Sequence, residues 1–435
     1  MDQAIIGLIF VAIMMISVLI GIDVAAALMA TSFVGMWFIG DFSTACSLFG
    51  VTAFGTLAEY VLAAIPLFMM MGILGNMSGA TEDLFDSANI LLARFRGGLG
   101  IATVLANAVF AAITGASIVS AAVFSKVAYP QMKRLGYEKK FALGTVAGSS
   151  SLGMLIPPSL LFIYYGYLTA ESIGRLFIAG ILPGLVLTAI FCIGIWGMVT
   201  LKPELAGRRQ DEKPVAKNWL LVVLKPWASV VLILVTLGGI YLGVFTPTEA
   251  GALGAFIALI IAFLRGRFTW IGLWKQLIDV GSTVGCIFIL IVGAQMFSRM
   301  LAFSTLPTAL SNYIMGLSVP PYIVILLLIV MYVILGALID SGSIILVTTP
   351  IVFPIITGLG YDPIWYGVVC VLSSEIGLIT PPFGLSVFVV KSVLTDEVTV
   401  EEIFRGTFPF VIMIAVAVVI ICLFPSLSTW LPSKM

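Results

Sequence analysis

Long apolar segments separated by short polar stretches make up most of this 435-residue sequence. Several of them approach or exceed the roughly 20 residues that an α-helix needs to cross the hydrocarbon core of a bilayer. Hydrophobic residues account for 61% of the chain and charged residues for only 10%, and a soluble protein of this length could not hide that much apolar surface from water. The pattern therefore predicts an all-α polytopic membrane protein.

One polar interruption of the apolar pattern occurs twice. The pattern Ser-Ser-x-x-Gly-x-x-x-Pro-Pro covers residues 149–158 and again 373–382, at an offset of 373 − 149 = 224. The same offset, without a gap, relates three further features: Pro130 and Pro354, Leu-Gly-Tyr at 135–137 and at 359–361, and Ser117 and Ser341. The chain therefore contains an internal duplication. In a membrane protein, duplicated apolar segments broken by Gly and Pro indicate the binding site of a transporter.

The basic residues predict that the two copies have opposite orientations. No Lys or Arg precedes Arg94, and four basic residues between 133 and 140 flank the first Leu-Gly-Tyr. The second Leu-Gly-Tyr has no basic neighbour and is followed by Asp362. Since Lys and Arg mark cytoplasmic loops, the first turn should be cytoplasmic and the second periplasmic. This predicts an inverted repeat in the bacterial inner membrane, with both termini periplasmic.

The same reasoning divides each copy into segments. The first copy is expected to contain short apolar segments at 4–20 and 24–39, an interfacial stretch at 43–58, a span at 59–77, an amphipathic surface helix at 81–97, a re-entrant hairpin at 98–127 with its tip at 114–117, and a broken span at 141–175. A span at 177–201 and a basic loop at 202–225 lead to the second copy. That copy is expected to contain apolar segments at 227–264, a surface helix at 268–280, a span at 283–303, an outer helix at 305–318, a hairpin at 320–353 with its tip at 340–343, a broken span at 363–390 and a last helix at 407–425.

Helix breaks at membrane depth free backbone groups for binding. Proline has no amide hydrogen and clashes with the preceding turn, so Pro157-Pro158 and Pro381-Pro382 must interrupt their helices, while Gly153 and Gly377 permit unusual backbone conformations. Freed carbonyls together with Ser and Thr hydroxyls suit a hard cation, and freed amides at the start of a half-helix suit an anion. The alternative is that the prolines only kink the helices and the serines bond back to their own helix.

Two acidic residues lie inside these segments. Asp340 is at the second tip, where a carboxylate costs about 2.5–3.5 kcal/mol to insert, and its counterpart in the first copy is Ala116. A bound cation would compensate this charge; a tip wet enough to need no ion is the alternative. Glu375 stands where the first copy has Ser151. It is a second ligand or a partner of the site, or else it faces Arg299 or a water path.

The composition argues against an enzyme. The sequence has no histidine, the commonest acid–base residue and metal ligand, and its five cysteines have neither metal-ligand nor CxxC spacing. No span carries a nucleophile with a base at helical spacing, and no cofactor is expected. Gly144 and Gly148 predict close helix packing rather than chemistry.

Four segments resemble the large membrane subunit of tripartite ATP-independent periplasmic (TRAP) transporters. They are Thr-Gly-Ala-Ser at 114–117, SSSLGMLIPPS at 149–159, FTPTEAGA at 245–252 and SSEIGLITPPFGLSVF at 373–388. The resemblance implies uptake of an organic acid, driven by the sodium gradient and supplied by a periplasmic substrate-binding protein. It also implies a small four-helix membrane subunit, expected here as a separate polypeptide, with no nucleic-acid partner and with sodium as the coupling ion.

The resemblance further implies an elevator-type transporter with a fixed scaffold and a moving transport domain. The expected regions are the scaffold and arm of the first repeat at 1–97, its transport domain at 98–182, a connecting helix and basic cytoplasmic loop at 183–226, the scaffold and arm of the second repeat at 227–319, its transport domain at 320–392, and a C-terminal helix at 393–435.

The family's site residues can be placed on this sequence through these motifs. Sodium ligands are expected from both tips and both broken spans: Thr114, Gly115, Ser117, Ser149, Ser150, Gly153, Met154, Asp340, Ser341, Gly342, Ser373, Ser374, Gly377 and Thr380. Substrate contacts are expected from Ser117, Ser151, Pro157, Ser343, Glu375 and Pro381. A stand-alone sodium-coupled anion symporter and a passive channel are the alternatives, and the sequence does not identify the acid.

Overall fold

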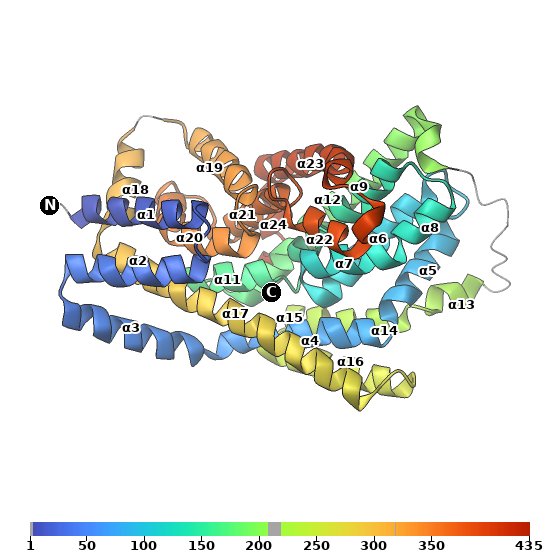
Figure 1. Cartoon of the computed structure of the whole chain (residues 1–435), viewed down its shortest axis with the longest axis horizontal. Helices are drawn as coiled ribbons and strands as arrows, with labels where there is room; N and C mark the ends of the chain where they lie inside the picture. The colour runs from blue at the N-terminus through green and yellow to red at the C-terminus, as the bar shows by residue number, and fades with distance from the viewer. Residues whose placement is uncertain (1–2, 208–218, 318) are drawn as a thin grey trace.

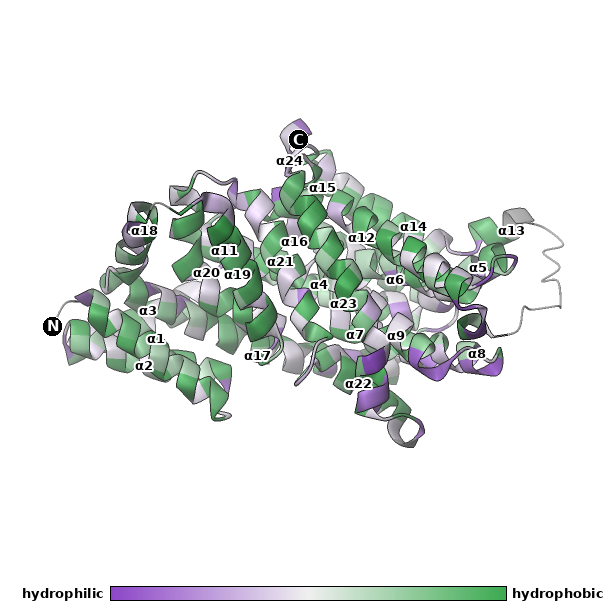
Figure 2. Cartoon of the chain, turned by 90° about the horizontal axis from the view of Figure 1, so that it is seen from above, coloured by the Kyte–Doolittle hydropathy of each residue, from purple (hydrophilic) through white to green (hydrophobic). Residues whose placement is uncertain are grey.

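The computed structural model describes residues 3–207, 219–317 and 319–435, and within these ranges the regular structure is entirely helical (Figure 1). Seven of the described helices are long and apolar enough to cross a membrane. Apolar residues cover most of the helices, whereas hydrophilic residues gather around α8 and α22 (Figure 2). The chain is a multi-pass membrane protein, as the sequence predicts. Part of the predicted basic loop, 208–218, lies outside the described residues.

The helices follow one another with short connections. The first half contains α1 (Gln3–Leu19), α2 (Val24–Ile39), α3 (Phe42–Leu57), α4 (Ala64–Met77), α5 (Ala80–Leu92), α6 (Gly98–Thr114), α7 (Ser117–Val127), α8 (Tyr129–Arg134), α9 (Lys139–Ser149), α10 (Leu152–Leu155), α11 (Leu160–Thr169) and α12 (Ile173–Leu201). The second half contains α13 (Trp219–Leu224), α14 (Trp227–Ile233), α15 (Gly239–Tyr241), α16 (Pro247–Leu264), α17 (Trp270–Phe303), α18 (Leu306–Gly316), α19 (Pro321–Gly336), α20 (Ser341–Gly358), α21 (Pro363–Leu378), α22 (Leu385–Leu394), α23 (Val400–Leu423) and α24 (Ser426–Thr429).

The 224-residue offset relates these helices as well as the sequence motifs. The first residue of α6 maps to 98 + 224 = 322, inside α19, and that of α9 maps to 139 + 224 = 363, the first residue of α21. The start of α11 maps to 160 + 224 = 384, one residue before α22, and the start of α12 maps to 173 + 224 = 397, three residues before α23. The duplication therefore extends over both halves of the fold.

One predicted boundary is wrong. The surface helix expected at 268–280 and the span expected at 283–303 form a single helix, α17, whose 34 residues give a length of about 51 Å. Gly281 and Gly285 lie inside it with nothing within 4 Å of an added Cβ. A single glycine costs only about 1 kcal/mol in a helix, which is too little to end an apolar helix whose backbone groups must stay bonded in a membrane. The counterparts of α17 in the first half are two helices, α3 and α4.

The duplicated Leu-Gly-Tyr is a helix stop. Gly136 and Gly360 have φ of +75° and +80°, the left-handed conformation that glycine adopts without steric cost. Tyr137 then stacks on Phe141, with ring centroids 6.2 Å apart, and Tyr361 stacks on Trp365 at 5.2 Å. The motif thus fixes the ends of α8 and α20 rather than forming part of a binding site.

The two turns lie near opposite ends of helix α23. Lys139, which follows the first turn, pairs with Glu402 in the first turn of α23, with 2.8 Å between Nζ and Oε2. Trp365, which follows the second turn, donates from Nε1 to the Ile421 carbonyl oxygen near the other end of α23, at 3.0 Å. The 19 residues between Glu402 and Ile421 span about 28 Å of helix.

Helices α9 and α23 touch backbone to backbone. A Cβ added at Gly144 would lie 2.0 Å from the carbonyl oxygen of Gly406, and one added at Gly148 would lie 2.3 Å from the ring of Phe410. The predicted close packing at the two glycines is confirmed. Since neither position tolerates a side chain without displacing its neighbour, α9 and α23 form one rigid pair.

The predicted amphipathic helix at 81–97 corresponds to α5, and ion pairs tie it to the second half. Asp83 accepts from Arg265 at 2.5 Å, Asp86 pairs with Lys225 at 2.7 Å, and Glu82 lies 3.4 Å from Arg267. The Asp83–Arg265 pair is the least exposed of these, with both side chains 18% accessible.

Candidate functional site

Both predicted tips are helix-to-helix turns inside the molecule. In the first copy α6 ends at Thr114, Gly115 takes a left-handed φ of +63°, and α7 starts at Ser117. In the second copy α19 ends at Gly336 and α20 starts at Ser341. The first turn lies at the predicted tip, whereas the second occupies residues 337–340, so that Ser341–Ser343 of the predicted tip form the first turn of α20.

Each Pro-Pro segment is docked on the tip of its own copy. The amide of Leu160 donates to the Gly115 carbonyl at 3.4 Å, and the amide of Phe383 donates to the Ala337 carbonyl at 3.2 Å. A Cβ on Gly115 would lie 1.9 Å from the Pro158 carbonyl oxygen. The peptide bonds 157–158 and 381–382 are both cis. The tip and the helix break of each copy thus form one unit.

The glycine that occurs at the same place in both breaks, Gly153 and Gly377, has a structural reason. A Cβ on Gly153 would lie 2.8 Å from the backbone of Ser117 at the first tip. A Cβ on Gly377 would lie 2.2 Å from the backbone of Gly336, just before the second tip. Both glycines are needed because a hairpin backbone crosses them at van der Waals distance.

The two units are joined by a hydrogen bond between Ser117 and Glu375. The Ser117 hydroxyl donates to Glu375 Oε2 at 2.7 Å, and both residues are fully buried. The other carboxylate oxygen of Glu375 has no hydrogen-bond partner among the described residues. Glu375 therefore lies against the first tip, and its role as a ligand or partner of a site stays a prediction.

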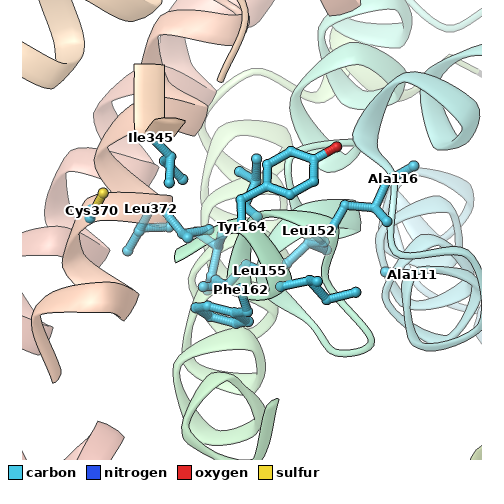
Figure 3. Close-up of a cluster of buried hydrophobic side chains, with 14 of the residues drawn as sticks. Ala111, Ala116, Leu152, Leu155, Phe162, Tyr164, Ile345, Cys370 and Leu372 are labelled. Carbon is cyan, nitrogen blue, oxygen red and sulfur yellow. The ribbon is translucent and has the colours of Figure 1, made fainter. Parts of the chain in front are cut away.

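Apolar residues from both copies surround this junction. Tyr164 of α11 lies between Ile345 and Leu372 of the second copy and Ala116 and Leu152 of the first (Figure 3). A Cβ on Gly342 would lie 3.0 Å from the Tyr164 ring, so the ring touches the second tip directly. Tyr164 is therefore a site residue that sequence reasoning missed.

Asp340 is the N-cap of α20. Its Oδ1 accepts from the Ser343 amide at 2.9 Å and its Oδ2 accepts from the Ser343 hydroxyl. The helix N-terminus favours a negative charge, so the carboxylate is stabilised in part by the protein itself. The first tip lacks this feature, since Ala116 caps α7 without a side-chain bond.

Most of the predicted hydroxyl ligands bond back to their own helix. Thr114, Ser150, Ser151, Ser374 and Thr380 donate to carbonyls three or four residues earlier, over 2.6–3.1 Å. Ser341 instead donates to the Ser374 carbonyl at 3.5 Å, across to the broken span. The Ser373 hydroxyl has no partner among the described residues. A hydroxyl that has donated its proton still offers lone pairs, so back-bonding leaves these oxygens able to act as ligands.

Asn107 is a second residue that sequence reasoning missed. Its side-chain amide donates to the Ser149 hydroxyl oxygen at 2.9 Å and links the first hairpin to the broken span, while its Oδ1 has no partner among the described residues. The structure buries this amide fully. An asparagine inside the apolar run 98–114 is the feature of the sequence that could have pointed to it.

The remaining predicted residues lie at the edge of the site. The Met154 carbonyl accepts from Ser159, which caps α11. Pro157 is buried, whereas Pro381 is exposed. The two Pro-Pro segments thus differ in their accessibility, although they share sequence and connections.

Duplicated helix breaks, each docked on a helix-to-helix tip within a polytopic membrane fold, define a transport protein rather than an enzyme. Residues 9–427 match the family model described as "Tripartite ATP-independent periplasmic transporter, DctM component". The chain belongs to this family of TRAP transporter large membrane subunits.

Individual relatives agree with the family. The chain is 34% identical to the C4-dicarboxylate TRAP transporter large permease protein DctM of Pseudomonas aeruginosa, over 88% of each chain. It is 30% identical to the 2,3-diketo-L-gulonate TRAP transporter large permease protein YiaN of Escherichia coli, over 97% of each. It is 31% identical to the isethionate TRAP transporter permease protein DctMQ of Oleidesulfovibrio alaskensis, over 84% of this chain and 57% of that protein.

A solved structure shares the fold. The Neisseria gonorrhoeae protein MtrF, described as an antimetabolite efflux pump, superposes with a TM-score of 0.62 at 13% identity, over 98% of this chain and 95% of that one. At this identity the likeness concerns the fold alone.

Proposed function

We propose that this chain carries out sodium-gradient-driven uptake of an organic acid across the bacterial inner membrane, supplied by a periplasmic substrate-binding protein. The observation that carries the proposal is the pairing of each helix break with a tip, joined across the copies by Ser117 and Glu375. A separate small membrane subunit completes the proposed complex.

Sodium is proposed as the coupling ion because the candidate site is rich in oxygen atoms and contains no Lys, Arg or His among its candidate residues. Hard cations choose cages of carbonyl, hydroxyl and carboxylate oxygens. The candidate ligands of the first copy come from residues 114–117 and 149–154, and those of the second from residues 340–342 and 373–380. Among the described residues, no group of three or more His, Cys, Asp or Glu could hold a metal ion, so the cage would rely on hydroxyls and backbone.

The substrate is proposed to bind between the tips. The start of α7 has no side-chain cap, which leaves its first amide groups to favour an anion, whereas at the start of α20 the Asp340 carboxylate already accepts from the Ser343 amide. The relatives are named for three different organic anions. This supports an organic acid as the substrate class and leaves its identity to experiment.

The proposed arrangement is an inverted repeat. The two Leu-Gly-Tyr turns lie near opposite ends of α23, one beside the basic residues 133–140 and the other beside Asp362. With basic residues on the cytoplasmic side, the second turn and both termini are periplasmic.

The proposed motion is an elevator. The transport domain would comprise 98–182 and 320–392, and the rigid pairing of α9 with α23 indicates that the C-terminal helix moves with it. Helix α5, tied by ion pairs to 225–267, and helix α18, whose Ser311 hydroxyl donates to the Pro354 carbonyl of α20 at 3.2 Å, would be the connecting arms.

The two partners, a small membrane subunit and a substrate-binding protein, are also proposed. The isethionate relative is longer than this chain, and for this chain we propose that the small subunit is a separate polypeptide. The second candidate is a stand-alone symporter, and the two differ in one assay. The chain alone in vesicles should move no substrate under a sodium gradient, and adding both partners should restore uptake.

Sodium coupling is tested in proteoliposomes that contain the complete transporter. Replacing the sodium gradient by potassium or choline should abolish uptake. Asp340→Asn keeps the helix cap but removes the charge, whereas Asp340→Ala removes both. Both variants should lose uptake if the charge is needed, and Asp362→Asn, another N-cap away from the tips, should not. Full uptake without sodium would overturn the proposal.

A further inference from the structure

A cavity of about 490 Å³ lies well apart from the two tips, where residues 59–61, 166–174 and 246–248 meet. Its lining combines the start of the α4 and α16 bundle with the end of α11 and the start of α12. In the proposed architecture the first pair belongs to the scaffold and the second to the transport domain. The cavity therefore bridges the fixed and the moving parts of the molecule.

Ser172, Thr246 and Tyr167 in the lining of this cavity have hydrogen-bond partners on the protein, whereas three other polar side chains of the lining have none among the described residues. Glu59 and Glu171 both line it, and the ion pairs among the described residues all involve other carboxylates. Arg175, one turn along α12 from Glu171, is not within ion-pair distance of it. Thr248 also lines the cavity, is only 4% exposed, and forms no side-chain hydrogen bond within the described part of the chain. Two carboxylates and one unpaired hydroxyl line the cavity and no described Lys or Arg does, so the lining suits a cationic group.

Aromatic rings complete the lining. Tyr60 is 64% exposed, and Tyr167 lines the cavity while its hydroxyl donates to Thr56 at 3.4 Å. Two carboxylates, a hydroxyl and aromatic rings form a receptor for a cationic side chain, and a guanidinium suits it well because it stacks on rings while it bonds to carboxylates.

In the predicted topology the cavity lies on the periplasmic side, so a partner that fills it would come from the periplasm. Residues 59, 170–175 and 242–247 all lie at the periplasmic ends of their spans. We propose that this cavity receives an Arg or Lys side chain of the substrate-binding protein when that protein docks, an inference that rests on the proposed function. A side chain seated there touches scaffold and transport domain together, so docking depends on the position of the elevator.

The test measures binding directly. The large and small subunits are placed together in nanodiscs, and the affinity of the purified, substrate-loaded binding protein is measured by titration for wild type and for Glu59→Gln/Glu171→Gln. The double variant should raise Kd about tenfold, and raising the salt from 50 to 300 mM should weaken wild-type binding more than binding to the variant. Asp362→Asn, which neutralises a carboxylate on the same predicted face while keeping its helix cap, should leave Kd unchanged.

Two results would contradict the proposed docking site. An unchanged Kd in a double variant that elutes like wild type overturns it. Loss of the small subunit from the variant complex would assign the cavity to that subunit instead. Glu171→Lys provides a second variant, since a lysine there would fill the site itself and should abolish docking. Uptake by wild-type proteoliposomes is measured separately, so failure of sodium-driven transport is distinguished from failure of the docking site.

Discussion

The hydrogen bond between Ser117 and Glu375 should couple the stabilities of the two copies. Ser117→Ala removes the only hydrogen bond that the buried Glu375 carboxylate makes among the described residues. Removing one partner of a buried hydrogen bond leaves the other partner unsatisfied, which costs about 1–3 kcal/mol. We therefore expect Ser117→Ala to lower the free energy of unfolding by about 1–3 kcal/mol. Glu375→Gln, which can still accept from Ser117, should cost less.

A double-mutant cycle makes this expectation quantitative. Once Glu375 is alanine, Ser117 has lost its partner, so adding Ser117→Ala should cost little more, which gives a coupling energy of about 2 kcal/mol. Unfolding is followed by titration of the purified protein in mixed micelles with a denaturing detergent. Ser125→Ala is the matched control, since this buried serine of α7 bonds only to its own helix, at the Ala121 carbonyl. Additive effects of the two site substitutions would refute the reasoning.

Three further expectations follow from the fold. Single cysteines at Lys133 and at Asp362 should be labelled by an impermeant thiol reagent from opposite sides in cells, and labelling of both from one side would contradict the inverted repeat. Gly144→Val should destabilise the protein by more than 2 kcal/mol, because its side chain would meet the Gly406 backbone, whereas Gly197→Val, at a glycine with open space around it, should cost about 1 kcal/mol or less. A disulfide between α4 at Gly75 and α6 at Ile113, whose side chain touches Gly75, should stop uptake and leave sodium binding intact; uptake by a fully cross-linked protein would argue against the elevator.

The order and type of the elements follow from the sequence because each boundary is marked by a strong local signal. The Pro-Pro pairs end their helices whatever surrounds them, and Gly115 permits a left-handed turn. No proline lies at the break expected before 283, and the glycines there, Gly281 and Gly285, do not end an apolar helix. The sequence therefore predicts the end of a helix correctly where sterics forbid the helix to continue, and wrongly where the residues only allow it to end.

The contacts across the site could not be predicted in the same way. Ser117 and Glu375 are 258 residues apart, and nothing in either local sequence names the other. Glu375 also lacks an acidic counterpart in the first copy, so the duplication gives no second example from which its partner could be inferred. The 42-residue link between Asn107 and Ser149 depends equally on how the hairpin packs against the broken span.

The hydrogen bonds of the site also bear on which ligand each part can take. Nine predicted hydroxyls donate their proton within the protein: Thr114, Ser117, Ser149, Ser150, Ser151, Ser341, Ser343, Ser374 and Thr380. These oxygens have only lone pairs left to offer, which suits a cation and gives nothing to an anion. The donors that remain are the unpartnered Ser373 hydroxyl and backbone amides at the helix starts and breaks, which suit an anion. Serine bonding back to its own helix is therefore compatible with the proposed sodium site, and the proposed acid would have to rely mainly on backbone amides.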